Sequence, residues 1–319
     1  MDNQRTYSDS LIAQIRKNLT RTSYKFITFP KLLFLCGKKF DREIIGDYAK
    51  TNRGVINNYI QARTENIFCI LSEDCWDNKL LNEIDLLTFE EFLAEVSDLI
   101  LLFVESMGSA CELGAFSFKE TSFCKKLLIV LDRKYENDES FINQGPIAKA
   151  KKHKSKVIYV DYDKALLMDR QIKTEIEKII ESSKILSHFN TRIINKDEKK
   201  IELNSFLIEI FEIIKLFQPI GHADIVELYK KIKGFNNFEF VKSNKKIFRN
   251  KILPYYILIF LKGAKLIEQD DNNNYTVPMK FMSQSDLLMF SFANTAMNRT
   301  RSRILARKFK YCDTYNGSK

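Results

Sequence analysis

An acid follows shortly after a strand-like apolar run in the segment ESMGSACELGAF, residues 105–116. A carboxylate at Glu112 could attack or stabilise a sugar C1′ as that carbon gains oxocarbenium character, which is the task of carboxylates in glycoside hydrolysis. A helix that begins just before this residue would help to keep the carboxylate ionised through its dipole. Glu112 is therefore the candidate catalytic residue.

A simpler interpretation of the same segment needs no substrate. Ser109 and Glu112 fit the capping box S-x-x-E, with Ser109 at the N-cap, and such a cap contributes about 1 kcal/mol to a helix. Two features favour chemistry instead. Gly108 lets a ligand approach the backbone while Ser106 and Ser109 offer hydroxyls, and the segment follows a strand, where open parallel sheets bind ligands. Both interpretations stay open.

Other catalytic chemistries find little support in the sequence. The histidines His153, His188 and His222 are far apart, and the six cysteines form no CxxC pair. We therefore expect no metal site, no Ser-His-Asp triad, and reduced thiols. The GxSxG elbow, the phosphate-binding loop GxxxxGK[ST] and the dinucleotide-binding GxGxxG pattern are all missing.

Strand and helix signals alternate in the first half of the chain. The strands are expected at 31–37, 66–74, 99–106, 125–132 and 156–163, and the helices between them at 55–63, 88–98 and 108–120. Nearly continuous apolar strands between helices are typical of a parallel sheet that is covered on both faces. The fold class is therefore α/β, with a Rossmann-like parallel sheet.

The chain of 319 residues is long enough for two domains. We expect the first domain at 1–165, with a short helix at 8–20, then a helical linker at 166–200. Residues 201–319 carry three helical segments and then a strand, a turn and a strand, which is the outline of a mainly α winged-helix domain. A role in docking nucleic acid or protein follows only indirectly from such a fold.

The net charge of +10 is concentrated in clusters. One cluster is KAKKHKSK at 149–156. The other lies in a C-terminal tail and comprises Arg299, Arg301, Arg303, Arg307, Lys308 and Lys310. These cations either form solvated surface or contact the phosphates of nucleic acid, and the nearby Phe309 and Tyr311 could stack on bases. The chain shows neither an apolar run of membrane-spanning length nor a signal peptide, so we expect a cytoplasmic protein without a membrane partner.

Four segments together resemble a known superfamily: FLCG (34–37), SED (72–74), AEVSDLILLFVESMGSACELGAF (94–116) and SFINQGP (140–146). They are similar to nucleoside 2-deoxyribosyltransferase-like proteins, whose sheet is flavodoxin-like. Within that superfamily they most resemble effector proteins of type II retron anti-phage systems, which join such a domain to a winged helix. The sequence departs from the transferases at Leu71-Ser72, where relatives often carry Tyr-Pro.

The resemblance implies roles for individual residues. Glu112 would be the nucleophile or the carboxylate that stabilises the cation. Gly37 would approach the ligand through its backbone, and Asp74 would hold sugar hydroxyls or the base. The loop of Ser106, Gly108 and Ser109 would line the sugar or phosphate. Asp98 is included with these substrate-site residues, although its expected role is structural or supporting, and Asn143 would complete the site, by analogy with an Asn that a neighbouring subunit supplies.

The resemblance also implies a function. The protein would be a toxin in anti-phage defence, an N-glycosidase that hydrolyses NAD as its substrate and needs no cofactor. The reverse transcriptase of the retron and its branched RNA–DNA (msDNA) would hold it inactive, and it would form a homo-oligomer, a dimer or higher. Two alternatives remain: a DNA-binding regulator that senses a nucleotide without catalysis, and a deoxyribosyltransferase of nucleoside salvage.

Overall fold

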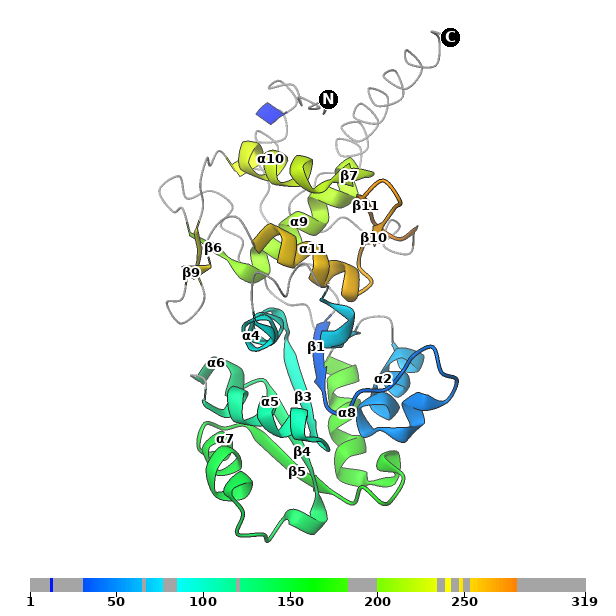
Figure 1. Ribbon diagram of the computed structural model, residues 1–319, viewed down its shortest axis with the longest axis vertical. Coiled ribbons are helices and arrows are strands. Elements are labelled where there is room, and N and C mark those ends of the chain that lie inside the picture. The colour runs from blue at the N-terminus through cyan, green and yellow to red at the C-terminus, as the bar shows by residue number, and fades with distance from the viewer. Residues whose placement is uncertain are drawn as a thin grey trace. The chain divides into compact units, whose positions relative to one another are not determined.

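The computed structural model of the protein describes residues 12–13, 31–64, 67–76, 85–118, 121–182, 200–233, 239–241, 247–248 and 253–279 (Figure 1). The chain divides into two compact units, of which one is Thr28–Leu186 and the other contains the C-terminal elements. The basic tail at 299–310 and most of the helix expected at 8–20 lie outside the described residues.

The first unit, called the α/β unit below, is built on a five-stranded parallel sheet with the order β2-β1-β3-β4-β5. The strands are β1 (Lys31–Cys36), β2 (Ile67–Ile70), β3 (Leu99–Val104), β4 (Leu127–Asp132) and β5 (Lys156–Val160). This order confirms the expected Rossmann-like α/β architecture, and it is the flavodoxin-like variant.

Helices cover both faces of this sheet. They are α2 (Asn52–Arg63), α4 (Leu86–Val96), α5 (Met107–Phe118), α6 (Thr121–Cys124), α7 (Ala148–Lys152) and α8 (Arg170–Ser182). Short helical turns lie at η1 (Asp47–Lys50), η2 (Ser72–Asp74), η3 (Arg133–Tyr135), η4 (Asn143–Ile147) and η5 (Leu166–Met168). Because side chains alternate along a strand, Leu33 joins a core cluster with Ile56 of α2 and Ile176 of α8, whereas the Phe34 ring meets the Phe116 ring of α5 edge-to-face at 6.1 Å.

Helix α8 corrects the expected boundary at residue 165. Ile172, Ile176 and Ile179 of this helix belong to the buried core under the sheet. Their spacing of four and three residues gives a charged helix one apolar stripe, and that stripe needs an apolar surface to cover it. Residues 170–182 are therefore part of the α/β unit and not a linker.

The second unit contains the expected three helices and hairpin. Its elements are β6 (Lys200–Glu202), α9 (Leu203–Phe217), β7 (Ile220–Gly221), α10 (His222–Lys233), β8 (Glu239–Val241), β9 (Ile247–Phe248), α11 (Leu253–Gly263), β10 (Glu268–Gln269) and β11 (Asn274–Thr276). Strands β10, β11 and β7 form an antiparallel sheet, and β6, β8 and β9 form a second small sheet that the sequence did not suggest. Within the described part of the chain, no helix has the length and apolar character to cross a bilayer.

Candidate active site

The strand order places a topological switch point between β1 and β3. From β1 the chain moves to β2 on one side, and it then crosses to β3 on the other side. In such sheets ligands bind outside the carboxyl ends of the strands at this point. Gly37 follows β1 here and Glu105 follows β3. The candidate site is therefore the carboxyl edge around these two residues.

Gly37 is required by a close approach within the protein. Its φ of +147° is unfavourable for any residue with a side chain. A Cβ added at Gly37 would lie 2.9 Å from Oε1 of Glu105 and 3.2 Å from Cβ of Arg53. The contact that demands glycine is thus made with Glu105 and Arg53, whereas the resemblance implies an approach to a ligand.

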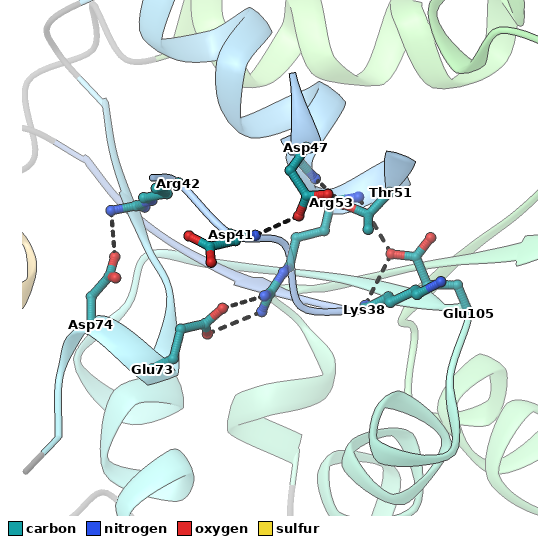
Figure 2. A network of polar contacts seen from close by, with 10 residues as sticks. Lys38, Asp41, Arg42, Asp47, Thr51, Arg53, Glu73, Asp74 and Glu105 are labelled. Carbon is teal, nitrogen blue, oxygen red and sulfur yellow. Dashed lines mark hydrogen bonds and ion pairs between the residues drawn. The ribbon is translucent and has the colours of Figure 1, made fainter. Parts of the chain in front are cut away.

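The carboxylate of Glu105 ties three segments together through backbone amides (Figure 2). The N–H of Lys38 donates to Oε1 at 3.0 Å, the N–H of Asn52 donates to Oε2 at 3.1 Å, and the N–H of Arg53 donates to Oε1 at 3.4 Å. Because the first N–H groups of a helix have no partner within the helix, a carboxylate is a favourable acceptor at the start of α2. Glu105 therefore fixes the loop after β1 and the start of α2 to the end of β3.

The cap of α5 differs from the expected one. The N–H of Ser109 donates to Oγ of Ser106 at 3.2 Å, and the N–H of Ser106 donates to Oγ of Ser109 at 2.9 Å. Ser106 is thus the N-cap and Ser109 is its reciprocal partner, so the capping-box interpretation of Glu112 is wrong. Ser109 is 1% exposed, and its hydroxyl also donates to the carbonyl of Ser106. Ser109 shapes the turn, and its position does not present the hydroxyl to a ligand.

Glu112 lies in the second turn of α5, where it has no capping role. Its Oε2 is buried without a hydrogen-bond partner among the described residues. Burial raises the pKa of Glu112 to about 8; the carboxyl of Glu90 also raises it, the guanidinium of Arg53 opposes the rise, and Glu73 adds to it. The helix dipole acts mainly within the first turn, so the expectation that it keeps this carboxylate ionised is wrong. Burial therefore favours the protonated form of Glu112.

A second buried acid, Glu90 of α4, was not singled out from the sequence. Burial raises the pKa of Glu90 to about 7, a hydrogen bond with Ser72 opposes the rise, Glu73 adds to it and Arg53 lowers it. In an amphipathic helix, an acid between apolar residues is expected to lie on the polar, exposed face. The local sequence therefore did not indicate that Glu90 is buried. Two protonatable carboxyls, Glu90 and Glu112, therefore share one electrostatic environment.

Two ion pairs hold the acids that follow β2. The guanidinium of Arg53 binds the carboxylate of Glu73 through both of its terminal nitrogens, with Nη1 donating to Oε2 at 3.2 Å (Figure 2). Nη1 of Arg42 lies 2.6 Å from Oδ2 of Asp74. Asp74 is thus at the expected edge of the sheet, but its carboxylate already has a cationic partner within the protein.

Asn143 faces its own loop in this structure. Its Nδ2 donates to the carbonyl of Tyr135 at 2.6 Å and to the carbonyl of Asp138 at 2.8 Å. Its Oδ1 is buried. The amide therefore stabilises the turn before η4, and the expected contribution of Asn143 to a site shared with a neighbouring subunit stays a prediction.

Asp98 lies at the opposite edge of the sheet from Glu112. Its Oδ2 accepts the N–H of Leu32 at 2.8 Å, and its own N–H donates to the carbonyl of Leu32 at 2.8 Å. These contacts join the amino ends of β1 and β3. Asp98 is structural, as its expected role allows, and it has to be removed from the residues that contact a ligand.

Two further expectations concern charge and metals. In the first basic cluster, Nζ of Lys149 lies 3.8 Å from the centroid of the Phe118 ring, while the cluster at 299–310 lies outside the described residues.

Among the described residues, His, Cys, Asp and Glu side chains form no group of three or more that could hold a metal ion.

The chain is similar to known retron proteins. The family model described as "STM3845 retron effector protein" matches residues 49–269. The chain is 29% identical over 198 residues to an Escherichia coli protein named "Retron Ec86 putative ribosyltransferase/DNA-binding protein", which covers 56% of this chain and 61% of that protein. It is 26% identical over 260 residues to the Escherichia coli "Retron Ec73 putative ribosyltransferase/DNA-binding protein", covering 70% of this chain and 78% of that protein.

The first of these matches spans less than two thirds of the relative's length, so similarity in the whole protein's activity does not follow from it. The family match is broader within this chain, since it covers more than half of the residues and includes Arg53, Glu105 and Glu112. The chain therefore belongs to the STM3845 retron effector family.

Proposed function

We propose that this retron effector is a toxin whose α/β unit is an N-glycosidase, and that it cleaves the N-ribosyl bond of NAD or a related nucleotide through Glu112. One observation carries this proposal. Oε2 of Glu112 is buried without a hydrogen-bond partner among the described residues, beside the switch point of the sheet. A buried carboxyl without a partner is unfavourable for folding, and such groups cluster at functional sites.

The chemistry fits a carboxyl in this state. When the C1′–N bond of NAD breaks, its electron pair leaves with nicotinamide, which becomes neutral, and the ribosyl group takes up positive charge. A carboxylate then stabilises that cation or bonds to C1′, and water finally supplies the hydroxyl and releases a proton. A cationic group beside Glu112 lowers its pKa from about 8, so binding of the cationic nicotinamide riboside would itself promote ionisation. In this proposal NAD is the substrate, and the reaction needs no cofactor.

The neighbouring residues would support the ribosyl group. A Cβ added at Gly108 would meet Oγ of Ser106 at 3.8 Å, an ordinary contact, so the described packing does not itself require glycine there. The glycine would instead leave room for the sugar or phosphate beside the hydroxyl of Ser106. Asp74 would have to leave its ion pair with Arg42 in order to bind ribose hydroxyls. Gly37 would support the site indirectly, because it allows Glu105 and Arg53 to lie close to the loop at the carboxyl edge of the sheet.

The second unit would dock the protein on its partner. The three helices and antiparallel hairpin support a winged-helix domain, and the names of both relatives include DNA binding. We expect this unit and the basic residues Arg299 to Lys310 to contact the reverse transcriptase and its msDNA, which would hold the enzyme inactive in a homo-oligomeric complex. The phosphates of branched nucleic acid are the natural partners of such a cluster.

Product analysis tests the enzymatic proposal. Purified wild type and Glu112→Gln are incubated with NAD, and separately with deoxynucleosides, with and without the reverse transcriptase and msDNA. Release of nicotinamide by the wild type alone supports the N-glycosidase. Full turnover by Glu112→Gln contradicts the mechanism, and base exchange between deoxynucleosides identifies a salvage transferase, an activity that the word ribosyltransferase in the relatives' names also allows.

A DNA-binding regulator without catalysis remains the second candidate, because both relatives carry DNA binding in their names. It predicts that Glu112→Gln is silent and that charge reversal at Arg301 and Arg303 abolishes function. Since Glu112 does not cap α5, this candidate offers no structural reason for an acid at that position.

A further inference from the structure

Lysines of the first basic cluster lie together on one side of the α/β unit. Helix α7 and the turn that leads from it into β5 expose Lys151, Lys152 and Lys154, and Lys149 is half-buried. Ala150, which lies between them in the sequence, is fully buried. The helix therefore packs through its small apolar residue, and its lysines remain in contact with solvent.

A lysine from a second segment joins this group. The hydroxyl of Ser155 donates to the carbonyl of Cys124 at 2.9 Å, and the exposed Lys125 directly follows Cys124. The N–H of Ser155 also donates to the carbonyl of Ala150 at 3.0 Å, so the turn after α7 is fixed both to its own helix and to the segment before β4. The two segments thus form one surface at the amino ends of β4 and β5 (Figure 1). This α7 lysine surface comprises Lys125, Lys149, Lys151, Lys152 and Lys154.

The α7 lysine surface lacks acidic partners. Within the part of the chain that the structure describes, none of its lysines pairs with a carboxylate, whereas Lys156, Lys164 and Lys178 of the same unit each do so. The negative ends of α6 and α7 favour a cation by about 0.3–1 kcal/mol, but one lysine at each end would be enough for that purpose. A solvated protein surface usually mixes charges of both signs. A group of cations without acids therefore indicates an anionic partner.

An exposed aromatic ring lies within the same surface. Nζ of Lys149 is 3.8 Å from the centroid of the Phe118 ring, and Phe118, at the end of α5, nevertheless remains 61% exposed. Nζ of Lys151 lies 5.2 Å from the centroid of the Tyr159 ring. Such cation–π contacts contribute about 0.5–1 kcal/mol at exposed sites, so they help to hold the two ammonium groups in place. Cations next to an exposed ring are the combination that binds single-stranded nucleic acid, because the cations neutralise phosphates while the ring stacks on a base.

We propose that the α7 lysine surface binds the phosphate backbone of single-stranded nucleic acid, with a base stacked on Phe118. The surface lies at the amino ends of the strands, so it is separate from the candidate active site at their carboxyl ends. The centre of a protein–protein interface is depleted in lysine, whereas lysine contacts with phosphates supply much of the affinity for nucleic acid. This inference goes beyond the proposed N-glycosidase and does not depend on Glu112. It also adds a contact on the α/β unit to the one proposed for the basic tail.

The test measures binding of the nucleic-acid-free, full-length protein to a fluorescein-labelled single-stranded oligonucleotide, by fluorescence anisotropy between about 50 and 200 mM salt. The surface variant combines Lys151→Gln, Lys152→Gln and Lys154→Gln. Its control loses the same charge at three exposed positions of the same unit, through Lys164→Gln, Lys173→Gln and Lys178→Gln. Two further variants are the arginine variant, with Arg at the three positions of the surface variant, and Phe118→Leu. Thermal unfolding checks that each variant is folded.

Each phosphate contact with a single strand adds about 0.7 to the steepness of log affinity against log salt concentration. We therefore expect the surface variant to reduce this steepness by about two, and to lower the affinity at the lowest salt concentration roughly tenfold or more. The control and the arginine variant should stay within about twofold of the wild type, because the cations of the surface are kept. Phe118→Leu should weaken binding without changing the salt dependence, since it removes stacking and no charge.

Several results would overturn the proposal. Equal losses in the surface variant and its control would mean that net charge alone matters, and wild-type affinity in the surface variant, or no binding by the wild type, would be equally decisive. Wild-type affinity in Phe118→Leu would contradict stacking on that ring. If polyglutamate of equal charge or phosphatidylserine vesicles displaced the labelled strand as readily as the same unlabelled strand does, the surface would belong to an acidic protein or to a membrane instead.

Two features keep the test decisive. If the surface variant did not fold, Lys125→Gln alone should still reduce the steepness by about 0.7, and an unchanged value would count against the proposal. Because binding needs no turnover, absence of nicotinamide release would count against the proposed function alone, and Glu112→Gln should bind the oligonucleotide as the wild type does.

Discussion

At the scale of single residues, the site is made of acids whose surroundings differ. Glu105 has three amide donors, Glu73 has a guanidinium, and Glu112 has an oxygen that is buried without a hydrogen-bond partner among the described residues. The carboxylates of the first two are thus occupied by donors from within the protein. Glu112 is disfavoured as an anion until something positive approaches it. This contrast separates the acids that build the site from the acid that would act in it.

Glu112→Gln should stabilise the protein at alkaline pH. The folded-state pKa of Glu112 is about 8, against an ordinary value of 4.5, so folding favours the protonated form. The unfolding free energy therefore falls as pH rises from about 4.5 to about 8, by at most about 5 kcal/mol at roughly 1.4 kcal/mol per unit. Glutamine cannot ionise, so Tm of the variant should match the wild type at pH 5 and exceed it at pH 8.

Glu139→Gln is a suitable control, because Glu139 is an exposed acid and its replacement should leave this difference in Tm close to zero at both pH values. If Glu112→Gln were no more stable than the wild type at pH 8, this result would contradict the description of the Glu112 carboxyl as buried without a hydrogen-bond partner.

Gly37→Ala should strongly destabilise the folded protein. The φ of +147° is strained for alanine, and the new methyl group would lie 2.9 Å from Oε1 of Glu105. We expect a loss of about 2–3 kcal/mol in unfolding free energy, measured by chemical denaturation, and loss of the Glu105 tie. Gly46→Ala separates strain from the clash: Gly46 has φ +80°, and a Cβ there meets no described atom within 4 Å. An equal loss in the two variants would show that the close approach at Gly37 is unimportant.

At the scale of elements, two serines build the start of helix α5, and Glu112 lies in its second turn. Ser106→Ala and Ser109→Ala each remove one half of the reciprocal cap, and each should cost about 1 kcal/mol of unfolding free energy. Ser117 gives a control on the same helix, because its hydroxyl is fully buried with no hydrogen-bond partner among the described residues. Ser117→Ala should cost nothing or stabilise the protein, since an unpaired buried hydroxyl is unfavourable. Denaturant midpoints of the three variants check this order.

The sequence predicted the elements better than the contacts between them. Apolar runs such as LILLFV mark buried strands through composition alone, and the order of strands and helices then restricts the sheet. The cap was misplaced because Ser106 and Ser109 both fit an N-cap, and only the hydrogen bonds distinguish them. Arg53 and Glu90 lie within helices, and their partners are 20 or more residues away or come from other elements, so no local spacing identified them.

At the scale of the whole molecule, the limits of the α/β unit decide where the chain can be divided. Ile172, Ile176 and Ile179 of α8 complete the core under the sheet. A fragment that ends at residue 186 should therefore unfold cooperatively on heating, whereas one that ends at residue 165 should lack this apolar cover and aggregate. In the intact chain, Ile176→Ala should cost about 2–4 kcal/mol and the exposed Lys173→Ala almost nothing. Cooperative unfolding of the shorter fragment would restore the linker interpretation of residues 166–182.

The tie made by Glu105 also bears on how this family can diverge. Its carboxylate is bound by the amide groups of Lys38, Asn52 and Arg53, and every residue except proline has such a group. The side chains at positions 38 and 52 can thus change through evolution without loosening the joint, whereas position 105 has no substitute of equal reach and charge, and position 37 must stay glycine. The loop that borders the candidate site can therefore acquire new side chains while its backbone keeps one path.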